Sequence, residues 1–268
     1  MVSEVLIEKI GGDVKLDKVE ALMYLTLVED TAKSEKELLA KYPDAKFIED
    51  KETDTQCYCL LSDDFEDAAL IIAFRGTEQK LRDWATDLDA YKMTYPYGNT
   101  DSKIQVHGGI LKAYKSVRGK IHEHVKSHSS KIKQFFVLGH SLGAGLATLC
   151  AVDMQYNFEE SNGPIICYTY GGLKVGNQAF VDSYSKRIKE NYRIYLKSDW
   201  VPFLPPDFVE GLLGAKYVHT LPGFPIGPWD IFLGIWEAIK RKFSKRIMAD
   251  ISNHSIELYR KYLRKLKD

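Results

Sequence analysis

A serine bracketed by glycines, in Gly139-His140-Ser141-Leu142-Gly143, has the type and spacing of a catalytic nucleophile. The apolar run 135–138 before it predicts a buried strand, and the small and apolar residues 144–152 after it predict a buried helix. When Gly-x-Ser-x-Gly connects a strand to a helix, it forms a very tight turn. The serine Oγ then points outward at the end of the strand. A side chain at position 139 or 143 would collide with neighbouring backbone, which accounts for both glycines. A glycine-rich turn without chemistry is the alternative interpretation, and the flanking strand and helix disfavour it.

Attack by a serine on a carbonyl creates an oxyanion, and two backbone N–H groups are candidates for stabilising it. The N–H of Leu142 opens the predicted helix and faces the same point as the Ser141 Oγ. The N–H of Thr77 follows the apolar strand 68–74 and a permissive glycine, Gly76. We therefore expect Thr77 to be the second donor, with its hydroxyl as a further candidate.

A serine nucleophile needs a base, and enzymes built on this turn carry the acid and then the histidine after the serine in the chain. Only His219 and His254 follow Ser141. His254 lies in a loop-like position at the opening of the last predicted helix, from which an imidazole can reach the serine, so it is favoured as the base. His219 lies in the strand-like segment 216–220, where a structural hydrogen bond is the alternative role. The remaining candidates on a helix, His122, His124 and His128, are expected on a solvated face.

Asp199 is the favoured acid because it directly follows the predicted strand 192–196, at the edge of the sheet where Ser141 is also expected. Its carboxylate would fix the tautomer of His254 and stabilise the imidazolium. A helix or turn cap is the alternative role for this aspartate. Asp153 and Asp182 are expected inside helices, with their carboxylates in solvent.

The elements that must position these residues alternate between strands and helices, which predicts an α/β fold with a mostly parallel central sheet. In such a sheet the reactive groups collect at the carboxyl ends of the strands. We see no repeat and no linker, so residues 1–268 are expected to form a single domain. Strands are expected at 46–49, 55–61, 68–74, 91–97, 103–107, 135–138, 164–170, 192–196 and 216–220, and helices at 15–40, 78–88, 107–127, 144–152, 178–189, 229–246 and 252–265.

A short predicted helix directly after Thr77 has the pattern of a lid. Its apolar residues are spaced i, i+3, i+4 and i+7 and its back is charged. Such a helix would cover an apolar site in water and turn outward on a lipid surface. Permanent packing against the core is the alternative. The apolar residues are Leu81, Trp84, Ala85 and Leu88.

The charge of the chain is balanced overall but unevenly distributed. A formal net charge of zero gives no global field that would attract nucleic acid. Residues 240–268, however, carry ten Lys and Arg against three Asp and Glu. The predicted helix that begins at Trp229 and ends at Arg246 places aromatic residues beside this basic cluster, which suits an anionic lipid surface. A buried helix with a solvated basic end explains the pattern equally well.

The sequence lacks several patterns that would indicate a particular compartment or a bound cofactor. It shows neither a signal-peptide pattern at its start nor an apolar run of about 20 residues. Its four cysteines make no metal-ligand spacing, and we expect buried thiols in a reducing compartment. The chain is therefore expected to be cytoplasmic or peripheral to a membrane, or secreted if a leader has been removed. No metal or cofactor is expected. The cysteines are Cys57, Cys59, Cys150 and Cys167.

Several further segments carry a resemblance to a known family. They are Ile72-Ala73-Phe74-Arg75-Gly76-Thr77, Leu81-Arg82-Asp83-Trp84, Val106-His107-Gly108-Gly109, Tyr168-Thr169-Tyr170-Gly171, Asp199-Trp200-Val201-Pro202, and His254 with Tyr259. With the serine motif, they resemble the class 3 lipase family, the fungal-type triacylglycerol lipases and their relatives, over roughly residues 15–265. The resemblance implies an α/β-hydrolase fold with a short helical lid. It also implies Ser141 as nucleophile, Asp199 as acid, His254 as base, and Thr77 with Leu142 as oxyanion donors.

The residues and the resemblance together predict a serine carboxylester hydrolase that cleaves acylglycerol ester bonds through an acyl-enzyme. A phospholipase, or an esterase for short-chain or aryl esters, is the alternative on the same scaffold. A binding module that keeps this fold without catalysis is a further alternative, because fold alone does not dictate function. It is disfavoured because such a module needs neither the three catalytic residues nor the oxyanion donors.

Overall fold

A seven-stranded sheet forms the centre of the computed structural model, which describes residues 15–63, 68–76, 92–94, 103–205, 216–220, 223–228 and 252–266. The strand order is β1-β2-β3-β6-β7-β8-β9. β1 and β2, and β2 and β3, pair antiparallel, and every later pairing in the sheet is parallel, which confirms the mostly parallel sheet. The strands are β1 (Lys46–Asp50), β2 (Thr55–Ser62), β3 (Ala69–Phe74), β6 (Gln134–His140), β7 (Ile165–Tyr170), β8 (Glu190–Leu196) and β9 (Gly223–Ile226).

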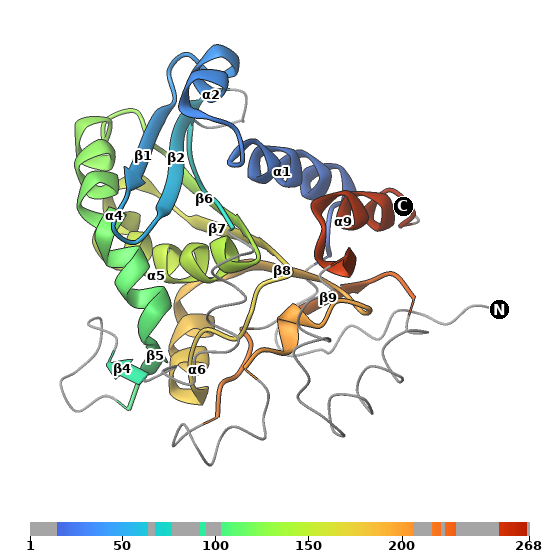
Figure 1. Cartoon of the computed structure of the whole chain (residues 1–268). Helices are drawn as coiled ribbons and strands as arrows, with labels where there is room; N and C mark the ends of the chain where they lie inside the picture. Colours follow the sequence, from blue (N-terminus) through green and yellow to red (C-terminus); the bar gives the residue numbers. More distant parts are fainter. Residues whose placement is uncertain are drawn as a thin grey trace.

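Helices cover both faces of this sheet, so its strands are apolar on both sides. Alternate residues of β3 show why: Leu70 and Ile72 pack into one core cluster, while Ile71 and Ala73 pack into the other. The first cluster lies under α4 (Gly108–Ser127), α5 (Leu142–Asn162) and α6 (Gln178–Arg187). The second lies under α1 (Lys18–Asp30) and α9 (Ile256–Leu263), which Figure 1 shows side by side across the sheet from α4 and α5.

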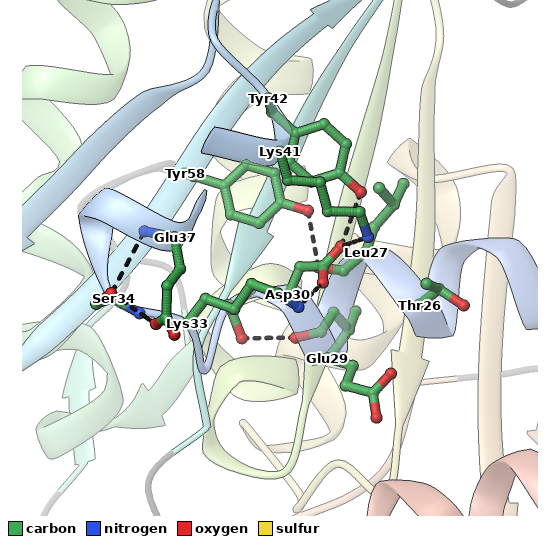
Figure 2. Close-up of polar contacts among 12 residues, drawn as sticks. Thr26, Leu27, Glu29, Asp30, Lys33, Ser34, Glu37, Lys41, Tyr42 and Tyr58 are labelled. Atoms are coloured by element: carbon green, nitrogen blue, oxygen red, sulfur yellow. Dashed lines mark hydrogen bonds and ion pairs between the residues drawn. The ribbon is translucent and has the colours of Figure 1, made fainter. Parts of the chain in front are cut away.

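The corner between α1 and α2 (Glu35–Lys41) is held by one buried carboxylate. Asp30 is 2% exposed and accepts hydrogen bonds from Lys33, from Lys41 Nζ at 2.6 Å and from the Tyr42 hydroxyl at 2.7 Å (Figure 2). Burial is the largest single influence and raises the pKa of Asp30, but these three donors together outweigh it and lower the pKa below its usual value. Ser34 starts α2 with a capping box.

Most of the expected elements are present, and one difference among the strands lies late in the chain. Residues 216–220 do not form a strand, since Val218 makes only an isolated bridge to Gly176. The last described strand is instead β9, in a segment where the sequence predicts no strand, since β9 begins with Gly223, contains Pro225 and is followed by Gly227. Proline is tolerated in a strand at the edge of a sheet, and β9 is the last strand in the sheet order.

Two further differences concern helix and strand ends. The final helix starts at Ile256 rather than at 252, because Ser252–His254 form a separate 3₁₀ turn, η3, and the Ser255 side chain caps α9. β4 (Lys92–Thr94) and β5 (Gln105–His107) make a separate antiparallel pair, and β5 begins two residues later than the strand expected at 103–107. Residues 91 and 95–97 of the other expected strand lie outside the described residues. The expected helices at 78–88 and 229–246 lie outside the described residues. Among the residues that are described, no helix has the length and apolarity needed to cross a membrane.

Candidate active site

Ser141 lies in the turn between β6 and α5, in a backbone conformation that few residues other than glycine adopt. Its φ is 58° and its ψ is −125°. A positive φ in a residue with a side chain is strained and is maintained only by the surrounding structure. Part of that restraint is the Ser141 N–H, which donates to the Tyr170 carbonyl at the end of β7 over 3.0 Å. The strain therefore marks Ser141 as a candidate functional residue on structural grounds alone.

The two glycines of the motif are required by backbone contacts, as expected. A Cβ on Gly139 would lie 2.2 Å from the Gly143 carbonyl oxygen. A Cβ on Gly143 would lie 2.4 Å from the Phe74 carbonyl oxygen. The turn is thus packed directly against the end of β3, with no room for either side chain.

Asp199 and His254, which are far apart in sequence, meet in the core. His254 Nδ1 lies 2.6 Å from Asp199 Oδ2. Asp199 is fully buried and follows the end of β8, while His254 is 3% exposed and ends the η3 turn. The other carboxylate oxygen, Oδ1, accepts the Val201 N–H at 2.9 Å. The carboxylate is therefore held in one orientation with respect to the imidazole.

A third residue, Tyr259 of α9, completes this arrangement, although the sequence indicates no role for it beyond a motif match. Its hydroxyl donates to Asp199 Oδ2 at 2.7 Å and accepts the Leu196 N–H at 3.2 Å. Burial, followed by the nearby charge of Asp199, raises the pKa of Tyr259 well above its usual value. The hydroxyl consequently stays protonated and remains a donor to the carboxylate.

Gly171 provides the space in which these side chains meet. Its φ is +56°, and a Cβ there would lie 2.6 Å from the Tyr259 hydroxyl, 2.9 Å from His254 Cε1 and 3.0 Å from Asp199 Oδ2. In the sequence, Gly171 directly follows the predicted strand 164–170 and belongs to one of the segments that resemble the lipase family, but neither pattern predicts a contact with Asp199 or His254.

Two polar atoms at the site are buried without hydrogen bonds in the described part of the chain, namely Ser141 Oγ and His254 Nε2. Because Nδ1 of His254 faces a carboxylate, the network assigns its proton to Nδ1 and leaves a lone pair on Nε2. A hydroxyl and an imidazole lone pair are the two groups between which a proton would move if the serine attacked a substrate.

The candidate oxyanion donors are only partly described. Leu142 is the first residue of α5, so its N–H has no acceptor within the helix. A Cβ on Gly76 would lie 2.5 Å from the His140 carbonyl oxygen and 3.1 Å from Ser141 Cβ, so the chain after β3 runs directly beside the serine. Thr77 follows Gly76 but lies outside the described residues, as do the lid candidates Leu81, Trp84, Ala85 and Leu88.

The other histidine that follows the serine is placed differently. His219 Nε2 makes a hydrogen bond with the Pro202 carbonyl, and the side chain is half-buried. Burial, and then the charge of Arg193, lowers the pKa of His219 well below its usual value. Among the described residues, no hydrogen bond joins His219 to Asp199. Its bond to the Pro202 carbonyl fits the alternative expected for it, a structural hydrogen bond.

Two sequence-based expectations on the helices were wrong. Asp153 is fully buried rather than solvated, and it accepts hydrogen bonds from Arg118 Nε at 3.0 Å, from His122 Nε2 at 2.6 Å and from the Tyr114 hydroxyl. His122 is therefore only 14% exposed and is not part of a solvated face. The reason is that α4 packs against α5, so polar residues on the facing sides are buried together. Asp182 is exposed, as expected.

Comparison with known proteins places this geometry in a family. The family described as Lipase (class 3) matches residues 71–209, which include Ser141 and Asp199. The chain belongs to the class 3 lipase family. A lipase of Rhizomucor miehei is 34% identical over 144 residues, which are 51% of this chain and 38% of that protein. The secreted mono- and diacylglycerol lipase A of Penicillium camembertii is 32% identical over 174 residues, 64% of this chain and 52% of that protein.

Solved structures of lipases share the fold. A propeptide complex of the Rhizomucor miehei lipase, in a deletion mutant, superposes with a TM-score of 0.62 at 27% identity over 79% of this chain and 67% of that chain. The lipase of Rhizopus microsporus var. chinensis superposes with a TM-score of 0.54 at 28% identity, over 78% and 70%. The α/β-hydrolase fold is thus confirmed. The match covers less than half of several relatives. It spans 38% of the Rhizomucor miehei lipase and 45% and 43% of two secreted mono- and diacylglycerol lipases, from Fusarium solani and Malassezia globosa.

Proposed function

We propose that this chain is a serine carboxylester hydrolase of the lipase type, which cleaves acylglycerol ester bonds with Ser141 as nucleophile, His254 as base and Asp199 as acid. The observation that carries the proposal is the buried Asp199–His254 pair, whose second imidazole nitrogen has no hydrogen bond among the described residues. The imidazole of His254 stacks on His140, which directly precedes Ser141 in the strained strand-to-helix turn. Membership of the class 3 lipase family supports the same chemistry.

The reaction proceeds through an acyl-enzyme. Ser141 Oγ forms a bond to the ester carbonyl carbon while its proton passes to His254 Nε2. The tetrahedral oxyanion accepts hydrogen bonds from the backbone N–H groups of Leu142 and Thr77. The intermediate then expels the alcohol, which takes the proton from His254. A water molecule, deprotonated by the same imidazole, attacks the acyl-enzyme and releases the carboxylic acid. Asp199 stabilises the imidazolium and stays ionised.

The substrate class is proposed from the relatives. Those from Fusarium solani and Penicillium camembertii are named mono- and diacylglycerol lipases. One relative favours a second candidate, because the phospholipase A(1) DAD1 of Arabidopsis thaliana is 30% identical over 152 residues, 51% of this chain and 33% of that protein. We therefore keep acylglycerol hydrolysis first and phospholipid hydrolysis second, with hydrolysis of short-chain or aryl esters as a variant of either.

Contact with a lipid interface is part of the proposal. The apolar, aromatic and basic side chains suited to it are found in two segments of the sequence: the expected lid, with Leu81, Trp84, Ala85 and Leu88, and the expected helix 229–246. Binding to vesicles with and without anionic lipid, at low and high salt, tests the basic segment. Binding that ignores both variables would remove the electrostatic part of the proposal.

We also propose that residues 1–268 form one domain, supported by the single sheet that separates the two core clusters. For the compartment, we propose a cytoplasmic or membrane-peripheral location, or secretion after removal of a leader. Four buried free cysteines support a reducing compartment. The secreted relatives support the other location. Fractionation of the source cells separates the two.

The function is tested by measuring hydrolysis of emulsified long-chain triacylglycerol, phospholipid vesicles and a soluble p-nitrophenyl ester, with Ser141→Ala in parallel. The proposal predicts a rate on triacylglycerol that rises steeply once the substrate forms an interface and is lost in the variant. A preference for phospholipid would move the second candidate ahead. Equal, negligible rates for wild type and variant on all three substrates would contradict the hydrolase proposal.

A further inference from the structure

His140, the last residue of β6 and the neighbour of Ser141, lies flat against His254. The centroids of the two imidazole rings are 4.5 Å apart and their planes differ by 27°, which is a stacked arrangement. The edge of the same His140 ring faces Tyr259, with centroids 5.6 Å apart and an interplanar angle of 75°. One side chain thus touches both the proposed base and the tyrosine that holds the proposed acid.

The hydrogen bonding of the His140 side chain indicates whether its nitrogen atoms or its ring face make the important contact. Its Nε2 is buried and has no hydrogen-bond partner in the described part of the chain. A buried unsatisfied nitrogen is unfavourable, so some other property of the residue must offset its cost. The ring face stacks on His254, and the ring edge meets Tyr259. The contacts that the structure shows for this side chain are therefore made by its ring.

We propose that His140 is a positioning residue for the proposed base, because its ring face stacks on the imidazole of His254 and fixes the plane of that ring relative to Ser141. The chain connection restricts this geometry further, since His140 ends β6 and is bonded directly to Ser141, which has the strained backbone conformation. The same segment of backbone therefore positions both Ser141 and the His140 ring on which His254 stacks. This inference rests on the proposed hydrolase function.

The charge state of His140 suits this role. Burial, and next the charge of His254, lowers the pKa of His140 well below its usual value. His140 is therefore neutral near pH 7. When His254 becomes an imidazolium during proton transfer, it meets a neutral ring face rather than a second positive charge.

The experiment compares His140→Phe, which keeps a flat ring, with His140→Leu, which keeps apolar volume but has no ring. The readouts are kcat and KM on a soluble p-nitrophenyl ester, the rate of labelling by a fluorophosphonate, and the thermal unfolding midpoint. Because misplacement of a catalytic group costs up to about 100-fold, we expect His140→Leu to lower kcat roughly 10- to 100-fold with little change in KM. His140→Phe should recover most of this loss.

The controls separate positioning from folding and from the proposed function. His124→Ala on α4 removes another partly buried histidine and should leave kcat unchanged. Unfolding midpoints for both His140 variants close to that of the wild type would exclude a general loss of structure. If activity depends on Ser141 but His140→Leu keeps the wild-type kcat, or if His140→Phe is as impaired as His140→Leu, the positioning role is wrong. If activity does not depend on Ser141, the hydrolase proposal fails first and this inference fails with it.

Discussion

At the scale of single residues, the chemistry of the site depends on groups that orient other groups. The Asp199 carboxylate receives an imidazole N–H, a tyrosine O–H and a backbone N–H, so neither of its oxygens is left to reorient. The sequence identified Asp199 and His254 because strand ends and chain order restrict the candidates. It could not identify Tyr259 or Gly171 as parts of the site, because their roles depend on contacts between residues that are far apart in the chain.

Tyr259→Phe tests the orienting hydroxyl. The substitution removes a donor to Asp199 and leaves the Leu196 N–H without its acceptor. We expect a loss of about 1–3 kcal/mol in the free energy of unfolding, as for a buried group left unsatisfied. We also expect a fall of roughly tenfold in kcat, in line with the modest cost of small misplacements. Tyr262→Phe on the same helix is the matched control, and an equal effect of both substitutions would contradict a specific role for Tyr259.

Gly171→Ala tests the requirement for space. The new methyl group would lie within 3.0 Å of three side chains of the site, and the residue has a φ of +56°. The backbone strain alone costs about 1–2 kcal/mol. The clash should in addition displace His254 and lower kcat by roughly 100-fold. Crystallography of the variant would show the displacement, and an unmoved His254 with full activity would show that the close contacts are not restrictive.

At the scale of elements, the apolar pattern of the strands predicted the central sheet well, because both faces of strands such as β3 are covered by helices. The pattern failed where polar or irregular residues are paired in the tertiary structure. Asp153 looked solvated because helical position alone does not reveal the donors that α4 provides. β9 was missed because Pro225 and its flanking glycines are typical of loops.

Asp30→Asn tests the α1–α2 corner shown in Figure 2. The buried carboxylate accepts three hydrogen bonds, two of them from lysines, and its pKa is lowered. Removing its charge should lower the free energy of unfolding by about 1–3 kcal/mol at pH 7, and by less as the pH falls through the carboxylate pKa. Chemical denaturation measures both effects. Asp44→Asn, at an exposed position in the following turn, is the control and should have little effect.

At the scale of the whole molecule, the stability should depend on pH through two partly buried histidines, His140 and His219. Burial lowers the pKa of His140 and of His219 well below the usual 6.5. The unfolded chain therefore binds more protons than the folded one at pH below about 6.5, and the free energy of unfolding decreases as the pH falls from that value. The carboxylates whose pKa is lowered titrate below their usual 3.8 to 4.5, so they do not offset this slope between pH 5 and 6.5.

Urea denaturation between pH 8 and pH 5 measures this dependence. Each of the two histidines should contribute a slope that approaches about 1.4 kcal/mol per pH unit once it is fully protonated in the unfolded chain. His140→Phe removes one of the two groups, so its slope should be correspondingly smaller. A free energy of unfolding that does not change between pH 8 and pH 5 would contradict the burial of both histidines in a neutral form.

The central claim is that Ser141 is a nucleophile activated by His254, and covalent labelling tests it most directly. A fluorophosphonate should form a single adduct, which peptide mass spectrometry would locate on Ser141. The labelling rate should fall by roughly 10⁴- to 10⁶-fold in His254→Ala, as for the loss of a catalytic base, while His219→Ala should label close to the wild-type rate. An adduct on another residue, or an unchanged rate in His254→Ala, would contradict the account.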